Sequence, residues 1–433
     1  MIRSNFICFP IFINKYMKRI LLFGTFSLFI ANIVYMLSGY GVNIFLAKTL
    51  GAANYGIYAI TISLVSLISI LFISGSQGAI SLLISQKKNN AESIKKSGIK
   101  LNLFIGVLVF IVYYLCADLI AIGLNDSSIA LYIKISSIMI PIFFLYPVFL
   151  GYFNGLQKYN KQSLVTISYS ITKFATIIFL VLSGFSLFGA IIGFALAPLA
   201  AIVMGAYLSE KNKAKKSFEY LKILKLAIPI TVFSFLFESA FTFGLFSVKA
   251  LLIENGLTGL YNAALQTSRL PYYLTMALAG ALFPIISESF SNNKKNELKM
   301  HLKKSLKYFI IFILPLSIIL SLFSKQILKI FFGNEFILAS ESLFWLAISS
   351  IFVSLFYIFC VVLIAMNKEK ETALISVIVL VVSVILNFLL IPVIGIKGAS
   401  IATGISFFVG SIICGINVFR IVFLKKKSEK SND

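Results

Sequence analysis

Residues 161–208 have the sequence KQSLVTISYSITKFATIIFLVLSGFSLFGAIIGFALAPLAAIVMGAYL, in which two apolar runs, 161–183 and 187–208, are separated by only three residues. A helix that crosses a membrane needs about 20 predominantly apolar residues, so each run is long enough to cross once. The short break between them leaves room only for a tight reversal. The stretch therefore predicts a helical hairpin inside a membrane.

Similar apolar runs fill the rest of the chain. Its 433 residues are 59% hydrophobic and 12% charged, whereas soluble domains are about 45–50% apolar and about 25% charged. Breaks at charged residues predict twelve transmembrane helices, near 20–47, 57–80, 98–122, 128–153, 161–183, 187–208, 222–249, 259–288, 304–323, 338–365, 372–392 and 397–424. We therefore predict an all-α integral membrane protein with almost no water-exposed domain.

The basic residues predict the orientation of these helices. With the N-terminus inside the cell, 30 of the 38 Lys and Arg residues fall in cytoplasmic segments, six in external segments and two within helices. Cytoplasmic loops of membrane proteins carry such an excess, so the net charge of +23 calls for no nucleic-acid partner. We expect both termini in the cytoplasm, with an N-terminal segment 1–19 and a basic tail 425–433. Met17-Lys18-Arg19 followed by an apolar run resembles the start of a protein chain. Residues 1–16 could therefore be an upstream extension.

Residues that bind metals or serve catalysis are sparse. The single histidine, His301, lies in a lysine-rich loop, and no C-x-x-C pair occurs among Cys8, Cys116, Cys360 and Cys414. Zinc sites and histidine-based triads need clusters of such residues. The longest external segment, about 324–337, holds one acid, Glu335, which is little for a membrane glycosyltransferase or polymerase. We predict no enzyme, no metal and no cofactor.

Short matches between the halves predict an internal repeat. With offsets of 203 to 210 positions, they pair Gly56-Ile57-Tyr58-Ala59 with Gly259-Leu260-Tyr261-Asn262, Gly189-Ala190 with Gly398-Ala399, and Gln157-Lys158 with Asn367-Lys368. Because each six-helix unit crosses the membrane an even number of times, both copies enter it in the same direction. We expect two parallel six-helix lobes, 20–208 and 222–424, around a central cavity, joined by a cytoplasmic linker at 209–221.

Four motifs carry a resemblance to a known family. They are Leu46-Ala47-Lys48-Thr49-Leu50-Gly51-Ala52-Ala53-Asn54-Tyr55-Gly56-Ile57-Tyr58, Asn154-Gly155-Leu156-Gln157-Lys158, Gly259-Leu260-Tyr261-Asn262-Ala263-Ala264 with Pro284, and Phe332-Gly333-Asn334-Glu335-Phe336. From about residue 18 onward the chain resembles the polysaccharide transporters, which are lipid-linked oligosaccharide flippases of the multidrug/oligosaccharidyl-lipid/polysaccharide (MOP) superfamily. In the first motif Lys48 stands where Arg is more usual.

The resemblance implies a function. Such a flippase moves undecaprenyl-diphosphate-linked sugar repeat units from the inner to the outer leaflet of the cytoplasmic membrane, for O-antigen, capsule or exopolysaccharide assembly. The implied partners are the anionic lipid-linked oligosaccharide, membrane lipids, and the polymerase and glycosyltransferases of the same pathway. A flippase for the peptidoglycan precursor shares this mechanism and stays open.

Three ionisable residues, Lys173, Glu238 and Arg269, lie inside predicted helices. Each is ten or eleven residues from the outer end of its helix, about 15 Å deep at ~1.5 Å per residue. Charges at that depth are costly and are functional by default. We predict that Arg269 binds the diphosphate through parallel hydrogen bonds, that Lys173 adds a second charge, and that Glu238 acts as a coupling group or charge switch.

Simpler roles for these charges stay open. Glu238 and Arg269 could only neutralise each other, and Lys173 could reach the interface or a carbonyl group. A multidrug cation exporter of the same superfamily is the alternative function, although cationic substrates would favour acidic cavity residues over Lys173 and Arg269.

Uncharged polar residues within the helices are weaker candidates. We predict that Gln266, one turn before Arg269 on the same face, and Asn32 contact the substrate. Asn43, Gln77 and Asn387 could likewise bind sugar hydroxyls. All of these amides could instead form hydrogen bonds between helices.

Overall fold

The structure, a computed structural model, describes residues 15–210, 218–252 and 254–424. Most of the predicted segment 1–19, most of the linker 209–221 and the whole tail 425–433 lie outside these ranges. The described residues form helices joined by short turns and contain no β-strand. The prediction of an all-helical protein is confirmed for them.

The first half begins with one long helix and ends with a pair that turns back sharply. Its elements are α1 (Lys15–Gln86), η1 (Lys88–Asn90), α2 (Ala91–Leu115), α3 (Ala117–Gly123), η2 (Ser127–Ile129), α4 (Ala130–Ser137), α5 (Met139–Gly155), α6 (Tyr159–Leu180), η3 (Val181–Phe185) and α7 (Ser186–Leu208).

The second half has more interruptions. Its elements are α8 (Tyr220–Leu251), α9 (Asn255–Ser268), α10 (Leu270–Ser291), α11 (Lys295–Tyr308), η4 (Phe309–Ile313), α12 (Leu314–Leu322), α13 (Ser324–Phe331), η5 (Asn334–Ala339), α14 (Ser340–Ala365), α15 (Glu369–Ile394), α16 (Ile396–Phe419) and η6 (Arg420–Leu424).

The helix α1 folds back on itself. The hydroxyl of Tyr55 donates a hydrogen bond of 2.9 Å to Oδ1 of Asn43, twelve positions earlier. In a straight helix these residues would be about 18 Å apart. The reversal occurs at Gly51, whose φ of 72° and ψ of 170° are non-helical. A φ in this range favours glycine over residues that have a Cβ atom.

A second reversal separates α6 from α7. Thr176 donates a hydrogen bond of 2.9 Å to the carbonyl of Gly193, seventeen positions later, which a straight helix would place about 25 Å away. The turn contains Gly184, with a φ of 92°. This is the hairpin expected from residues 161–208.

Nine helical runs in the described part of the chain are long and apolar enough to cross a membrane. A tenth is obtained if the pair Ser127–Ser137 and Met139–Gly155, bent by 41°, is one span. Two of the nine runs, Phe26–Gln86 and Tyr159–Leu208, contain the reversals at Gly51 and Gly184, so each comprises two antiparallel arms. The chain is a multi-pass helical membrane protein.

Several helices extend beyond the predicted boundaries. The third predicted helix, 98–122, begins at Ala91 and ends at Leu115, and the ninth, 304–323, begins at Lys295. Lys and Glu are good helix formers. Charged residues therefore do not mark where these helices begin.

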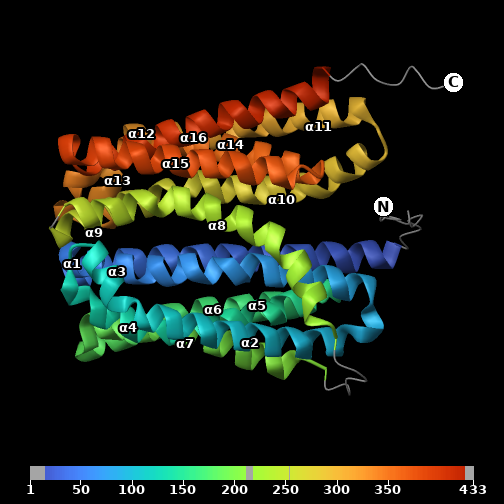
Figure 1. The fold of residues 1–433 in the computed structure, drawn as a ribbon, viewed down its shortest axis with the longest axis horizontal. Helices are drawn as coiled ribbons and strands as arrows, with labels where there is room; N and C mark the ends of the chain where they lie inside the picture. The colour runs from blue at the N-terminus through green and yellow to red at the C-terminus, as the bar shows by residue number, and fades with distance from the viewer. Residues whose placement is uncertain (1–14, 211–217, 253, 425–433) are drawn as a thin grey trace.

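The helices form two groups that run roughly side by side along the long axis (Figure 1). One group contains α1 to α7, and the other contains most of α9 to α16. The helix α8 packs against both α1 and α15. It crosses from the first group to the second, and its first half lies against α1, where a Cβ atom on Gly75 would come within 2.7 Å of the carbonyl of Ala227.

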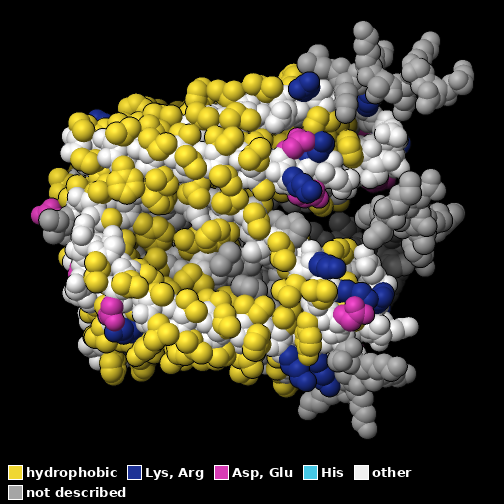
Figure 2. All heavy atoms as spheres, viewed as in Figure 1, with side chains coloured by type: hydrophobic (Ala, Val, Ile, Leu, Met, Phe, Trp, Pro, Cys, Tyr) yellow, Lys and Arg dark blue, Asp and Glu magenta, His cyan; other side chains and the backbone are white. Residues whose placement is uncertain are grey.

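The surface view shows a broad apolar band between two polar ends (Figure 2). Most of the Lys and Arg side chains visible in this view gather at the end where α1 begins and η6 finishes. We call this the basic end, and the opposite end, with α3 and α9, the far end.

Left-handed backbone positions recur in both halves. Gln157 and Asn367 have φ values of 60° and 58°, and both belong to the repeat predicted from the sequence. The turns at Gly184 and Gly395, with φ of 92° and 61°, form a second such pair. A non-glycine residue with positive φ is uncommon, so the paired turns agree with a repeated unit.

A pair of glycines allows a close approach of the two halves. A Cβ atom placed on Gly56 would lie 2.8 Å from the backbone nitrogen of Gly259, and one on Gly259 would lie 3.1 Å from that of Gly56. Only residues without a side chain allow α1 and α9 to approach this closely. These glycines occupy equivalent places in the predicted repeat.

Candidate functional site

An ion pair links α8 to the junction of α9 and α10. Nη2 of Arg269 donates a hydrogen bond of 2.7 Å to Oε1 of Glu238 and another of 3.1 Å to Thr242. The two charged side chains are only 13% and 17% exposed. Their proximity follows from the antiparallel arrangement of α8 and α9, as the sequence had suggested.

Arg269 retains unused hydrogen-bonding capacity. Only Nη2 donates to the carboxylate, and the buried Nε atom has no acceptor among the described residues. The guanidinium carbon lies 4.8 Å from the centre of the Phe241 ring, a cation–π contact. Since Arg carries five N–H donors, this pairing leaves donors for a second anion.

The sequence predicted Arg269 within a single helix, 259–288. The structure places it between two helices instead. It follows the last residue of α9, Ser268, and precedes α10. Pro271 at the start of α10 has no N–H to donate to the preceding turn, which explains the break.

Lys173 on α6 is buried, with 5% of its surface exposed. Its Nζ atom lies 4.9 Å from the ring centre of Tyr35 and 5.5 Å from that of Tyr169. No carboxylate within the described ranges forms an ion pair with it. The side chain therefore neither reaches the surface nor is neutralised by an acid, and aromatic rings solvate it instead.

A cavity of about 80 Å³ lies beside Lys173. It is lined by residues of both halves, including Asn43, Tyr58, Lys173, Asn262 and Gln266. The cavity is too small for a sugar. It marks the place where α1 and α6 meet α9.

Gln266 lines this cavity. Its side-chain amide donates to Oδ1 of Asn262 at 3.3 Å, and its backbone carbonyl accepts a hydrogen bond of 2.8 Å from the hydroxyl of Tyr40. Arg269 has helical dihedral angles, and its N–H donates to the backbone carbonyl of Gln266, so the predicted i, i+3 spacing of the two residues is kept.

Asn32 is exposed on α1 and makes no side-chain hydrogen bond within the described part of the chain. It lies three positions before Tyr35, and therefore on the same helical face as the ring that contacts Lys173. It does not line the 80 Å³ cavity.

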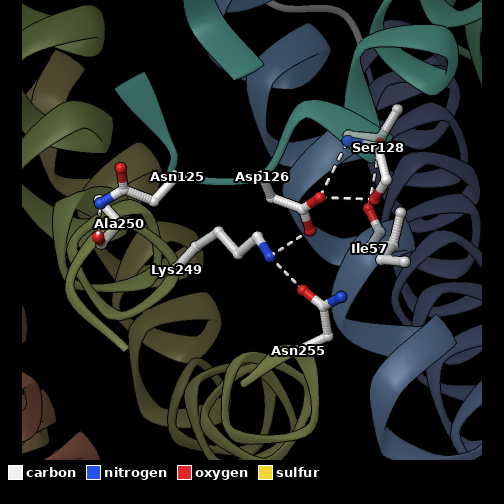
Figure 3. Close-up of polar contacts among 8 residues, drawn as sticks. Ile57, Asn125, Asp126, Ser128, Lys249, Ala250 and Asn255 are labelled. Carbon is white, nitrogen blue, oxygen red and sulfur yellow. Dashed lines mark hydrogen bonds and ion pairs between the residues drawn. The ribbon is translucent and has the colours of Figure 1, made fainter. Parts of the chain in front are cut away.

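At the far end, a polar cluster that sequence reasoning missed joins the two halves (Figure 3). Nζ of Lys249 on α8 lies 2.5 Å from Oδ2 of Asp126, and it also contacts Oδ1 of Asn255. Beside this pair, Asn125 donates a hydrogen bond of 2.6 Å to the carbonyl of Ala250. We call Asp126, Lys249, Asn255, Asn125 and Ala250 the latch.

The charged groups of the latch have hydrogen-bond partners on several sides. The side chain of Lys249 is 2% exposed, and Asp126 accepts two further hydrogen bonds from Ser128. Burial raises the pKa of the Asp126 carboxyl, but the hydrogen bonds from Lys249 and Ser128 outweigh this effect and leave its pKa below the usual value. Lys249 is one of the six basic residues that the sequence places in external segments, and no partner was predicted for it. Its partner lies 123 positions away, a distance at which the sequence gives no signal.

Comparisons with known proteins agree with this fold. Two solved structures, described as the inward-facing and outward-facing conformations of a multidrug resistance MATE family transporter of the MOP superfamily, superpose with TM-scores of 0.78 and 0.71 at 15% and 16% identity. The matches cover 90% and 94% of this chain, and 94% and 96% of those chains. The chain therefore shares the fold of these two solved structures.

The family model described as "Polysaccharide biosynthesis protein" matches residues 21–290, and the one described as "MatE" matches residues 246–393. Because the first match spans more than half of the chain, the protein belongs to the polysaccharide biosynthesis protein family.

Three relatives match over most of the chain. The protein named "Probable low-salt glycan biosynthesis flippase Agl15" of Haloferax volcanii is 25% identical over 90% of this chain and 82% of its own length. The lipid II flippase MurJ of Bacillus subtilis is 22% identical over 92% and 82%, and a protein of Shigella flexneri named as an O-antigen transporter is 26% identical over 83% and 88%. These relatives are transporters and not enzymes.

Proposed function

We propose that the protein is a flippase for undecaprenyl-diphosphate-linked oligosaccharide repeat units. It moves them from the inner to the outer leaflet of the cytoplasmic membrane by alternating access, for O-antigen, capsule or exopolysaccharide assembly. The observation that carries this proposal is the pair of shielded cationic side chains, Arg269 and Lys173, set against one acid, Glu238. A diphosphate headgroup supplies the anion that such a site favours.

In this proposal the chain crosses the membrane twelve times, with both termini in the cytoplasm. The reversals at Gly51 and Gly184 and the bent pair α4–α5 support twelve crossings. The concentration of basic side chains at the basic end supports a cytoplasmic location for that end. The lobes are 20–208 and 222–424, with a linker at 209–221 and basic segments before residue 20 and after residue 424.

Arg269 and Lys173 bind the diphosphate in this mechanism. Arg269 offers the donors that Glu238 leaves unused. Among the described residues Lys173 contacts aromatic rings and no carboxylate, so its ammonium is available to the anion. Gln266 and Asn32 then contact the first sugar or the phosphate. Glu238 acts as the switch, because it holds Arg269 in the empty state and gives way to the incoming anion.

The latch closes the external side in the described state. Its contacts join the two halves at the far end, and among the described residues no ion pair joins them at the basic end. Substrate enters from the cytoplasmic side, and the latch opens when the lobes rock toward the outward-facing state. The larger TM-score against the inward-facing neighbour supports this assignment.

Export of multidrug cations is the second candidate, because the structural neighbours are described as multidrug transporters. The charge balance of the site opposes it. Its acid, Glu238, is already paired with Arg269, whereas Lys173 is a buried cation. The function named for the Bacillus relative, lipid II flipping, would use the same site.

The test is complementation of a strain that lacks its own flippase for such a glycan. We expect Arg269→Gln to lower export by at least about 30-fold, since removing a desolvated charged contact costs ~2–5 kcal/mol. Arg269→Lys should restore only part of it, because parallel hydrogen bonding is lost. Arg420→Gln, an arginine exposed at the basic end, is the matched control.

Wild-type export by Arg269→Gln at normal protein abundance would remove Arg269 from the site. Efflux of cationic dyes that depends on Glu238 would favour the multidrug alternative. Nearby genes for glycosyltransferases and a polymerase would define the pathway.

A further inference from the structure

A second, larger cavity lies on the first half of the molecule. It is a groove of about 590 Å³, formed by one face of the second arm of α1 together with the end of α5 and the start of α6. Ser74, Gln77, Ser81 and Ser85 line one wall, and Asn154 and Gln157 line the other. A volume of this size falls within the range of about 300–1,000 Å³ seen for small-molecule sites.

The chemistry of the groove differs from that of its surroundings. None of the described residues that line it is charged, although lysines such as Lys87 and Lys158 lie next to it in the sequence. Its lining consists mainly of hydroxyls and amides, which both donate and accept hydrogen bonds. Such a wall suits a neutral ligand rich in hydroxyl groups, whereas an anion would favour the neighbouring lysines.

Some side chains of the lining are held by hydrogen bonds, and others have no hydrogen-bond partner among the described residues. Ser81 donates a hydrogen bond of 2.8 Å to Oδ1 of Asn154, whose amide donates in turn to Gln162 at 3.1 Å. Among the described residues, Gln77 and Gln157 have no side-chain hydrogen-bond partner. The groove therefore offers two free amides beside a fixed one. Tyr159, whose ring packs against Gly24 of α1, completes the lining.

The position of the groove relates it to the charged site. The second arm of α1 contributes Ser63 to the 80 Å³ cavity beside Lys173 and Ser74 to the groove. Eleven residues of helix at ~1.5 Å each separate them by about 16 Å. The groove thus lies on the basic-end side of the cavity beside Lys173, farther along the second arm of α1.

We propose that this groove binds the neutral sugar residues of the lipid-linked glycan while the transporter is open at its basic end. The inference rests on the proposed function and adds a sugar subsite, centred on Gln77, to the diphosphate site at Arg269 and Lys173. The amides and hydroxyls of the groove then discriminate between glycans, a task that phosphate-binding cations cannot perform.

The test measures binding to the purified full-length protein in detergent. The probes are bare undecaprenyl diphosphate and a panel of undecaprenyl diphosphates that carry one to three neutral hexose or N-acetylhexosamine residues. We expect at least one sugar-bearing probe to bind several-fold more tightly than the bare lipid. Gln77→Leu should remove about 3- to 10-fold of that advantage, the value of one or two hydrogen bonds, and leave binding of the bare lipid unchanged.

Gln326→Leu is the matched control, because Gln326 is an exposed glutamine on α13, far from the groove. Retained binding of the bare lipid shows that a variant is folded. Equal affinity of the wild type for bare and sugar-bearing lipids, or an unchanged sugar advantage in Gln77→Leu, would overturn the subsite. Failure of the proposed function looks different, because bare undecaprenyl diphosphate would then not bind and Arg269→Gln would change nothing.

Discussion

Two ion pairs of this protein are both shielded from solvent, yet they join different parts of the chain. Glu238 and Arg269 lie within the second half and meet through one guanidinium nitrogen, and the buried Nε of Arg269 has no acceptor in the part of the chain that the structure describes. Asp126 and Lys249 join the two halves, and Asn255 and Ser128 complete their hydrogen bonds. Arg269 in the first pair therefore has donors left for a ligand. The second pair has its hydrogen bonds completed and connects the two halves of the chain.

The largest expected effect concerns the first pair. Glu238→Gln or Arg269→Gln alone should lower protein abundance, because removing one partner of a buried pair costs about 3–5 kcal/mol. The double variant should recover abundance and remain inactive in export, at least about 30-fold below the wild type. Complementation with membrane protein levels measured in parallel gives both values.

Full export by the double variant would show that the pair only neutralises itself. The two ion pairs would then differ in position alone, and Lys173 would have to carry the anion site. Export by Lys173→Gln, compared with Lys100→Gln on the exposed side of α2, would decide that point.

A smaller effect is expected for the latch. In Asp126→Asn the buried ammonium of Lys249 loses its counter-ion, which weakens the externally closed state. A cysteine at position 63, in the cavity beside Lys173, should then react at least about tenfold faster with a membrane-impermeant thiol reagent added outside. The measurement uses a background without the native cysteines, in right-side-out vesicles.

The charge-reversed variant Asp126→Lys with Lys249→Asp tests the pairing itself, because it restores attraction and should slow the reaction again. An unchanged reaction rate in Asp126→Asn would mean that other contacts, such as the glycine contact between α1 and α9, close the external side unaided.

The smallest effect is expected from pH. Because the pKa of Asp126 lies below its usual value, the latch contributes stability above the ordinary pKa of about 3.9 and loses it only as pH falls through the lower, folded-state value. Between pH 8 and pH 5 the reaction rate at position 63, normalised to an exposed control cysteine, should change less than about twofold. A steep rise within that range would place a different titrating group in the closed state.

The parts predictable from the sequence are those that depend on local chemistry. Apolar runs locate the membrane helices, and the depths of Glu238 and Arg269 on adjacent antiparallel helices indicate that they can meet. Gly51 and Gly184 lie between predicted helices, where the chain does reverse.

The parts not predictable depend on tertiary contacts. Asp126 and Lys249 are 123 positions apart, and nothing near either residue identifies the other. The aromatic surroundings of Lys173 come from Tyr35 on another helix, which by itself resembles an interfacial anchor. The break at Arg269 was not predicted, although Pro271 at the start of α10 has no N–H to donate to the preceding turn.

The contact between Gly56 and Gly259 has a consequence for the origin of the chain. Each glycine occupies the same place in its own half, and each meets the other's backbone. In a two-fold symmetric dimer, a residue on the axis meets its own copy in the same way. The repeat predicted from the sequence would give the molecule the layout of a homodimer fused into one polypeptide. A half-length ancestor would have needed a single glycine to let two subunits approach, and duplication would have turned that one position into two that must now both stay small.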